Sequence, residues 1–293
     1  MKIFKKNPPK WSRSEMVKEI KIFSSIYKER PIKNNIGGMM FPHMFAFYFI
    51  LKKIKPDFVV ESGVYKGQST WLIERTLPNT NILSIDLDFS NIVYKSKKAK
   101  YSTTDFKYQD FSKLTKNSLV FFDDHQNALD RLKQSKNFKF KHMVYEDNYC
   151  PGTGDCYSFK KIILNSGSVR ELSAKDIKKT LKKILKELLK KKFNKNYVPK
   201  IEMDKLKYIW KLDDVSPNKN DKKFFVKNIY SYFEFPPIFK TFNTRWHDEW
   251  NDKKYPTETP LLDFSCKKKY KEAYKEAYKE AMWYTWIAYL KLL

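Results

Sequence analysis

The sequence is poor in cysteine and has no long apolar run. Only three cysteines occur in 293 residues, and their spacing matches neither a disulfide framework nor a zinc-binding pattern. We therefore expect a reduced, cytoplasmic setting. No stretch approaches the roughly eighteen apolar residues of a membrane-spanning helix. Residues 1–11 are rich in Lys and Pro and lack the apolar centre of a signal peptide, so neither a transmembrane segment nor a secretory leader is predicted.

Acidic residues are few relative to basic ones. The chain has 59 Lys+Arg against 33 Asp+Glu, which gives a formal net charge of +26, and most of the excess is Lys. Such a charge would attract nucleic acid or an anionic membrane surface. Genomes of low GC content, however, enrich Lys together with Ile, Asn, Phe and Tyr, and all of these are abundant here. We favour this compositional explanation and keep a polyanionic partner, such as nucleic acid, as the alternative.

The apolar content is sufficient for a large hydrophobic core. Hydrophobic residues make up 42% of the chain and aromatic residues 17%, with 23 Phe and 19 Tyr. This composition excludes a mostly disordered chain. The length suits one large α/β domain with elaborations, or one domain plus a smaller appendage.

Apolar strands alternate with helices through the first half of the chain. Strands are expected at residues 57–62, 81–85, 103–109, 118–122 and 142–146. Helices are expected at residues 12–29, 39–53, 67–77, 89–100 and 126–135. This alternation is typical of a parallel sheet covered on both faces, with right-handed crossovers.

The alternation weakens after about residue 160. A Lys-rich helix is expected at 177–193, where an apolar stripe indicates a core-facing helix with a solvated basic face; binding to an anionic surface is the alternative. Residues 207–212 and 228–235 are candidates for the last, antiparallel strands. Tyr-Lys-Glu-Ala repeats at 270–281 place two Glu residues three positions before a Lys, a spacing at which the two side chains form ion pairs on a helix. The repeats therefore predict a single helix.

The first candidate site lies at the end of the strand at 57–62. This strand ends near Glu61, Gly63 allows a sharp turn beside a ligand, and Gly67 allows close approach at the start of the next helix. The next strand ends at Asp86, whose carboxylate can bind both hydroxyls of a ribose, and Asp110 follows the third strand, where it would meet an adenine amino group. Because ligands of open α/β sheets bind at the carboxyl ends of strands, this pattern predicts a nucleoside pocket. The alternative is a plain turn with a solvated Asp86.

The acid, the glycine and the second glycine four residues later resemble the first motif of the class I S-adenosylmethionine-dependent methyltransferases. Glu61, Gly63 and Gly67 match it. The resemblance implies S-adenosylmethionine as cofactor, with Ser69 among its contacts, and a Rossmann-like α/β fold with a doubly wound, mostly parallel sheet. Tyr65 fills the position of the middle glycine in the dinucleotide fingerprint, so NAD is disfavoured.

Four carboxylates follow the next two expected strands. Asp123 and Asp124 come after the strand at 118–122, and Glu146 and Asp147 come at the end of the strand at 142–146. At one sheet edge these groups would repel one another unless a cation neutralised them. Hard oxygen ligands of this kind suit Mg²⁺. The alternative is that these acids cap the backbone of the segments that follow them.

These carboxylates also resemble those of the metal-dependent sugar O-methyltransferases of the macrocin and mycinamicin type and of the related cephalosporin hydroxylases. The resemblance implies Asp123 or Asp124, Glu146 and Asp147 as metal ligands and His125 as the base, with Asp124 beside it in the catalytic group. It covers roughly residues 37–161. The family separates its Asp and His by two residues, whereas one residue separates Asp123 from His125, so the register of ligand and base stays open.

Three further features lie outside these motifs. Residues 151–158 contain two glycines after the last catalytic strand end, which suits a substrate-contacting loop or lid and equally a plain turn. His43 lies in an apolar helix and is interpreted as a packed histidine rather than a ligand. Trp246 and Trp250 flank charged residues; we interpret them as an exposed aromatic helix edge, with a sugar-stacking platform as the alternative.

The sequence thus predicts a three-part chain. N-terminal helices (1–55) would cap the sheet, residues 56–240 would form the S-adenosylmethionine-binding methyltransferase domain, and residues 241–293 would form a helical, basic extension. The expected reaction is metal-assisted O-methylation of a sugar, glycan or small-molecule hydroxyl, in which a divalent ion lowers the pKa of the hydroxyl and His125 removes its proton.

Two other functions remain alternatives. One is methylation of a nucleic-acid ribose. Methylation of a base amine is disfavoured because no Asn/Asp-Pro-Pro-Tyr/Phe motif follows the strand at 118–122. The other is a catalytically inactive protein that binds S-adenosylmethionine or has a structural role.

Overall fold

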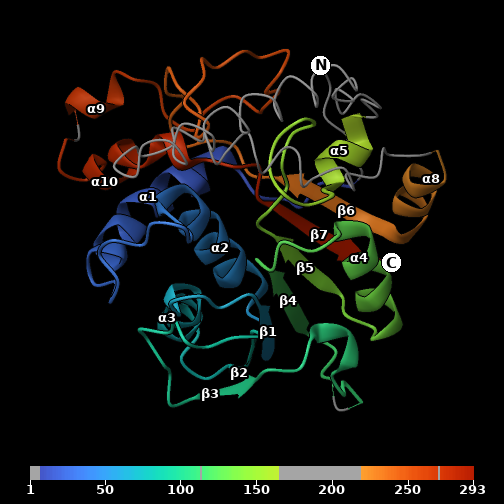
Figure 1. The fold of residues 1–293 in the computed structure, drawn as a ribbon. Coiled ribbons are helices and arrows are strands. Elements are labelled where there is room, and N and C mark those ends of the chain that lie inside the picture. The colour runs from blue at the N-terminus through green and yellow to red at the C-terminus, as the bar shows by residue number, and fades with distance from the viewer. Residues whose placement is uncertain (1–6, 113, 165–218, 270) are drawn as a thin grey trace, which may run out of the picture.

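The computed structural model describes residues 7–112, 114–164, 219–269 and 271–293 (Figure 1). Within them, seven strands form one sheet in the order β3-β2-β1-β4-β5-β7-β6. The strands are β1 (Phe58–Ser62), β2 (Asn81–Ile85), β3 (Ala99–Ser102), β4 (Ser118–Phe122), β5 (His142–Tyr145), β6 (Ile229–Glu234) and β7 (Ala288–Leu292). The first five are parallel to one another, whereas β7 is antiparallel to both β5 and β6. The expected Rossmann-like, mostly parallel α/β fold is confirmed.

Helices cover both faces of this sheet (Figure 1). One face packs against α1 (Arg13–Lys28), α2 (Phe41–Ile54), α3 (Gln68–Thr76) and α10 (Lys275–Lys279). The other packs against α4 (Ala128–Asn137), α5 (Phe159–Leu164) and α8 (Lys219–Asn228). Short helices η1 (Phe106–Tyr108), α9 (Cys266–Lys269) and η2 (Ala281–Trp283) complete the described elements. None of the helices in these described ranges is long and apolar enough to span a membrane.

The N-terminal helices form as the sequence predicts. Ser12 caps α1 in a capping box with Glu15, which satisfies free N–H groups at the helix start. The helix α2 is buried around most of its circumference because it lies between α1 and the sheet. Its Phe47 ring stacks on Phe121 of β4 with the centroids 4.1 Å apart. This contact fixes α2 over the centre of the sheet, close to the strand ends.

Strand register brings four chain segments to the same edge of the sheet. Ser62 at the end of β1 is level with Ile85 of β2 and with Phe122 of β4. Phe122 is in turn level with Tyr145, the last residue of β5. The segments that follow these four strands therefore leave the sheet side by side, as expected for the ligand-binding edge of an open α/β sheet.

Two predictions for the segment between β2 and β4 are wrong. Residues 89–98 contain no helix, since the backbone N–H groups of Val93 and Tyr94 donate to the carbonyl of Lys66 instead of forming helical bonds. The third strand is Ala99–Ser102, and residues 103–109 hold the short helix η1, capped by Asp105. Tertiary hydrogen bonds to the glycine turn after β1 outweigh the local helical pattern here.

The C-terminal part also differs from the prediction. An antiparallel strand, β6, does form within residues 228–235, but among the described residues of the Tyr-Lys-Glu-Ala repeat only Lys275–Lys279 are α-helical. The last residues form β7, which the sequence did not predict and which lies inside the main sheet. Its apolar run supplies both faces, with Tyr289 in one core cluster and Leu290 in the other. The expected elements at 177–193 and 207–212 lie outside the described residues, and the three-part division of the chain stays a prediction.

Stability should fall in mild acid because His142 is held neutral between β5 and β7. Burial, followed by the charges of Lys291 and Lys141, lowers the pKa of His142 to about 4, and its Nδ1 lies 2.8 Å from the Tyr289 hydroxyl. A depressed folded-state pKa gives stability that is present above the unfolded value and lost as pH falls toward 4. We expect this loss to reach about 2 kcal/mol, allowing for partial exposure.

The His142→Gln variant should lack that part of the acid loss. Urea unfolding of both proteins at pH 7 and pH 4.5 measures it. Equal losses in the two proteins would show that His142 is not the group responsible.

Candidate active site

A cavity of about 350 Å³ opens at the carboxyl ends of β1, β2 and β4. Its walls are the segments that follow these strands, at residues 62–65, 85–88 and 123–126, together with Gly37 and Gly38 from the turn before α2. The volume is in the range of small-molecule sites. The cavity therefore lies where the glycine motif predicted a ligand.

Gly63 makes the closest approach between these walls. Its φ is +93°, and an added Cβ would lie 2.0 Å from the backbone oxygen of Asp123. The turn is also tied to the neighbouring strands, because Gly63 N–H donates to the Ile85 carbonyl (2.9 Å) and Asp123 N–H to the Ser62 carbonyl (2.8 Å). Only glycine fits this position.

Gly67 serves a different contact. Its φ is +88°, and an added Cβ would lie 2.0 Å from the carbonyl oxygen of Tyr94. Gly67 is not among the residues that line the cavity. It allows the segment 89–98 to pack against the start of α3, so its predicted approach to the cofactor stays a prediction.

Asp86 lies at the cavity wall and fixes the glycine turn. Its Oδ2 accepts hydrogen bonds from the backbone N–H groups of Val64 (2.8 Å) and Tyr65 (3.0 Å). The side chain is partly exposed to the cavity. It is thus oriented before any ligand binds and keeps acceptor capacity for ribose hydroxyls.

Glu61 lies beneath the turn and is fully buried. Thr70 and Ser84 hydroxyls donate to its Oε2 at 2.6 and 2.7 Å. Burial raises the pKa of Glu61, although hydrogen bonds from Ser69, Thr70 and Ser84 oppose the shift. Neither Glu61 nor Ser69 lines the cavity. Their contact with the cofactor stays a prediction; the structure shows them joining β1, β2 and α3.

Asp110 is exposed and caps the N–H of Ser112 at 2.8 Å, outside the cavity wall. The wall contains Asp105 instead. The sequence reasoning did not single out Asp105, because it placed a strand across residues 103–109. The adenine contact of Asp110 stays a prediction.

Arg131 of α4 also lines the cavity and was not foreseen. Its guanidinium is 4% exposed and pairs with Asp105 Oδ2 (2.9 Å) and Asp124 Oδ2 (2.8 Å). Ser62 Oγ donates to the same oxygen of Asp124 at 2.7 Å. Arg131 and Ser62 therefore hold Asp124 at the wall of the larger cavity. In the sequence, the only hint of a special role for Arg131 is that Arg is scarce in this Lys-rich chain.

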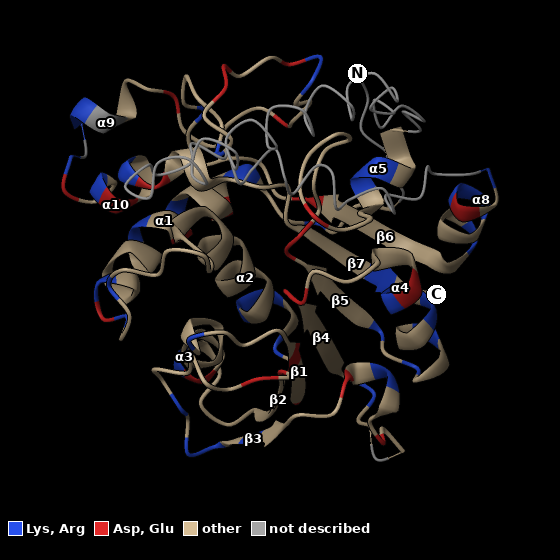
Figure 2. Cartoon of the chain, in the orientation of Figure 1, with Lys and Arg blue, Asp and Glu red and all other residues tan. Residues whose placement is uncertain are grey.

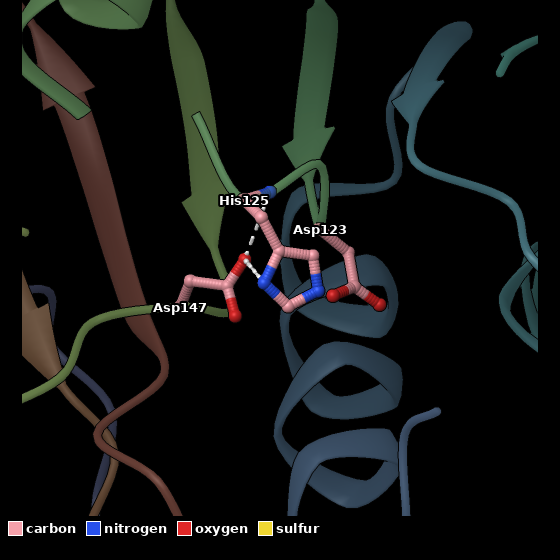
Figure 3. A group of neighbouring side chains, drawn as sticks. All are labelled: Asp123, His125 and Asp147. Atoms are coloured by element: carbon pink, nitrogen blue, oxygen red, sulfur yellow. Dashed lines mark hydrogen bonds and ion pairs between the residues drawn. The ribbon is translucent and has the colours of Figure 1, made fainter. Parts of the chain in front are cut away.

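Asp123, His125 and Asp147 lie together where β4 and β5 end (Figure 3). One potential ligand atom of each lies within 4.8 Å of the others. The backbone N–H of His125 donates to Asp147 Oδ2 (3.2 Å), and its ring Nδ1 lies 3.7 Å from the same oxygen. His125 adopts a left-handed φ of +53°, which turns the chain at this point. Its side chain is 51% exposed, whereas that of Asp147 is 2% exposed.

These groups strongly affect one another's protonation. Burial and the charge of Glu146 raise the pKa of both Asp123 and Asp147 well above its usual range. The charge of Asp147 and a hydrogen bond to Asp155 raise the pKa of His125 to about 11. In the absence of a cation, the negative charge of these neighbouring carboxylates therefore favours the protonated forms of Asp123, Asp147 and His125.

Glu146 is partnered by His43 of α2. The ring Nδ1 lies 2.5 Å from Glu146 Oε1, and Thr285 N–H donates to Nε2 at 2.8 Å, which leaves the ring proton on Nδ1. Burial raises the pKa of Glu146, but the electrostatic interaction and hydrogen bond with His43, together with the charge of Arg245, outweigh burial, so the pKa is lowered. His43 is packed, as expected, and also orients a predicted ligand.

The same residues surround a second, small cavity of about 20 Å³. Asp123, His125, Glu146 and Asp147 line it, and the space suits one ion or water. Asp147 Oδ1 is buried and has no hydrogen-bond partner among the described residues. The two carboxylates of Asp123 and Asp147 and the imidazole of His125 fit a divalent cation. The oxygens suit Mg²⁺, and the imidazole also suits Mn²⁺, Fe²⁺ or Zn²⁺. Glu146 borders this space, but its carboxylate contacts His43.

The loop at residues 151–158 reaches the site. Asp155 Oδ1 lies 2.9 Å from His125 Nδ1, so the loop contacts the predicted base. Trp246 and Trp250 do not form an exposed helix edge, because residues 241–250 contain no helix. Trp246 stacks on Tyr255, with ring centroids 5.6 Å apart and planes 7° apart, and both tryptophans pack in an aromatic cluster.

Acidic residues gather at the strand ends in Figure 2, whereas Lys and Arg are spread over several helices. This distribution holds for the described residues. It leaves the strand ends as the place where the chain concentrates negative charge.

Parts of the chain are similar to solved methyltransferase structures. CmcI with S-adenosylhomocysteine (SAH) is 16% identical, with a TM-score of 0.34 over 38% of this chain and 62% of that chain. CmcI with Mg and S-adenosylmethionine is 22% identical, with a TM-score of 0.31 over 36% and 53%. An SAH-bound methyltransferase of Podospora anserina is 11% identical, with a TM-score of 0.34 over 45% and 62%.

The chain thus spans less than two thirds of the length of each of these three structures. No protein-family model matches it, and no curated protein matches it. We therefore base the function on the geometry of the site.

Proposed function

We propose that this protein is an S-adenosylmethionine-dependent methyltransferase that methylates a hydroxyl of a sugar, glycan or small molecule with the help of a divalent cation. One observation carries the proposal: the large and the small cavity adjoin. Asp123 and His125 line both of them. A nucleoside in the larger space would place its reactive end beside the group of carboxylates and histidine.

The cofactor side of the proposal rests on the larger cavity. Asp86 is oriented by two backbone N–H groups and faces the cavity, where its carboxylate can accept from both ribose hydroxyls. Gly63 lets the turn after β1 lie directly against the backbone of Asp123, which lines both cavities. Asp105 and Arg131 also line the larger cavity and would lie near the adenine.

The acceptor side rests on Asp123, His125 and Asp147. A divalent cation held by the two carboxylates would polarise the acceptor hydroxyl and relieve the charge that keeps a proton on His125. His125, the most exposed of the three, takes the proton of the hydroxyl at its ring. Asp155 and Asp147 both face the ring Nδ1, which leaves Nε2 for the acceptor proton. Alignment of the acceptor oxygen with the methyl group then supplies much of the acceleration.

Asp86→Ala should lose the stabilisation that SAH gives to the wild-type protein. We expect SAH to raise the melting temperature of the wild-type chain by several degrees and that of Asp86→Ala hardly at all, because the ribose contact and the ordered glycine turn are both lost. Differential scanning fluorimetry measures the shift, and calorimetry measures the affinity.

Asp130→Asn is the matched control, since Asp130 is exposed and pairs only locally with Lys133. Asp110→Asn in the same assay tests the predicted adenine contact. Stabilisation by NADH in place of SAH would contradict the proposed cofactor.

A further inference from the structure

Arg245 faces the group of acids from the far end of the chain. It follows β6 and lines the small cavity together with Asp123, His125 and Asp147. Among the described residues, no carboxylate lies within ion-pair distance of its guanidinium, and no hydrogen bond engages it. This sets it apart from Arg131, which carries two ion pairs at the neighbouring cavity.

The side chain of Arg245 is held by aromatic rings rather than by acids. Its guanidinium carbon lies 5.6 Å from the ring centre of Tyr149 and 5.9 Å from that of Trp246. Trp246 is itself fixed, because its ring stacks on Tyr255. Stacking over ring faces orients a guanidinium and leaves its N–H groups free.

The backbone around Arg245 is also ordered. Thr244 N–H donates to the carbonyl of Asp248 (2.9 Å), and Thr244 Oγ1 donates to Asp248 Oδ1 (2.5 Å). His247 N–H donates back to the Thr244 carbonyl at 3.0 Å. Arg245 is therefore presented from a closed turn, so its position at the cavity does not depend on a ligand.

The nearest acids are already engaged elsewhere. Glu146 contacts His43, and Asp147 accepts from the backbone of His125. The guanidinium keeps its charge in this setting: burial lowers the pKa of Arg245, but interactions with Tyr149, Glu146 and Asp147 outweigh burial and raise the pKa. A half-buried guanidinium with its donors unused is matched best by an oxyanion with two parallel acceptor oxygens.

We propose that Arg245 binds a carboxylate or phosphate group of the methyl acceptor, so that the acceptor is an anionic hydroxy compound such as a sugar acid or a sugar phosphate. This inference rests on the proposed function and narrows its substrate class. Because the small cavity has room for one ion only, the acceptor would lie at its rim, with its hydroxyl at His125 and its anionic group at Arg245. Tyr149, Trp283 and Met40 supply the apolar wall beside it.

The carboxylate of the cofactor's methionine part is a second source of the same chemistry. Gly37 and Gly38 line both cavities, so the two ligands would meet there. Arg245 lines the small cavity and does not line the larger one. The position of the guanidinium therefore favours the acceptor, and the two sources can be separated by experiment.

The test measures binding of inorganic phosphate and of acetate to the full chain by calorimetry, in Mg²⁺ and at constant ionic strength. Arg245→Gln should weaken phosphate binding at least about tenfold. Arg245→Lys keeps the positive charge but loses the two parallel N–H donors of the guanidinium, so its phosphate affinity should lie between those of the wild type and Arg245→Gln. Arg75→Gln is the control, because Arg75 is an exposed residue of α3 paired with Glu29. Equal binding by wild type and Arg245→Gln, or no binding by wild type, would overturn the proposal.

A second arm identifies the source of the anion. Arg245→Gln should bind SAH as tightly as the wild type does. A loss of SAH affinity with unchanged affinity for 5′-methylthioadenosine, which lacks the amino-acid part, would assign Arg245 to the cofactor and overturn its role toward the acceptor. If the wild-type chain binds phosphate through Arg245 but does not bind SAH, the proposed function fails while the anion site stands.

Discussion

Asp147→Asn is expected to abolish binding of a divalent cation at the end of β5 and to leave SAH affinity within about twofold. Asp147 is nearly fully buried beside His125, and one of its oxygens has no hydrogen-bond partner. An amide keeps the shape but cannot supply the anionic oxygen that a hard cation requires. The proposed cofactor contacts lie on the segments after β1 and β2, and Asp147 does not line that cavity.

The same substitution should have the opposite effect on the metal-free chain. Burial and the charge of Glu146 raise the pKa of Asp147 well above its usual range, so its ionised form is unfavourable there. An uncharged amide removes this repulsion, and the melting temperature in EDTA should stay equal or rise. In Mg²⁺ or Mn²⁺ the wild type should gain stability and the variant should not.

Calorimetric titration with Mn²⁺ and melting curves with and without EDTA measure these effects. Asp130→Asn serves as the control, since its exposed carboxylate pairs only with Lys133. Undiminished cation binding by Asp147→Asn would remove the metal from the proposed mechanism. The hypothesis that remains would then be methyl transfer without a metal.

Gly63→Ala is expected to eliminate SAH binding, with a loss of at least about a hundredfold, and to destabilise the fold by several kcal/mol. The added Cβ would lie 2.0 Å from the backbone oxygen of Asp123, and neither chain segment is free to move. Both are tied by strand hydrogen bonds, from Gly63 to Ile85 and from Asp123 to Ser62. Relief of the overlap therefore has to widen the gap between β1 and β4 and displace the cavity wall.

Gly152→Ala separates this steric effect from backbone strain. Gly152 also has a positive φ, +75°, but an added Cβ meets nothing within 4 Å. It should cost about 1–2 kcal/mol from the left-handed conformation alone and leave SAH affinity unchanged. Urea unfolding and SAH calorimetry on the two variants give the comparison. A Gly63→Ala protein that binds SAH normally would show that the turn does not shape the cofactor cavity.

The sequence by itself determined the elements whose signals are local. The capping box at Ser12 and the apolar period that follows set α1, and short apolar runs set β1, β2, β4 and β5 at or near their observed bounds. In a parallel sheet, consecutive strands with in-register ends bring their following segments to one edge. Asp86, Asp123 and Asp147 could therefore be placed at one site from their positions alone.

The tertiary structure decided which side chains pair with the other acids near this edge of the sheet. Asp124 pairs with Arg131 of α4, and Glu146 contacts His43 of α2, which is about a hundred residues away in the chain. Such pairs follow from how helices cross the sheet, and no spacing along the sequence encodes that geometry. The same holds for Glu61, which reads as a cofactor ligand in the motif but is buried against Thr70 and Ser84.

The C-terminal third shows the limit most clearly. The run that forms β7 is apolar apart from Lys291, so its pattern alone does not separate a strand from a buried helix. Its strand partners, β5 and β6, lie far upstream in the sequence. The run forms an antiparallel strand because, between β5 and β6, its backbone N–H and C=O groups find hydrogen-bond partners on both sides. The segment after β6 brings Arg245 to the acids that follow β4 and β5. The local sequence thus indicated which acids lie at the strand ends, and long-range pairing, which local patterns cannot specify, decided which positively charged side chains face them.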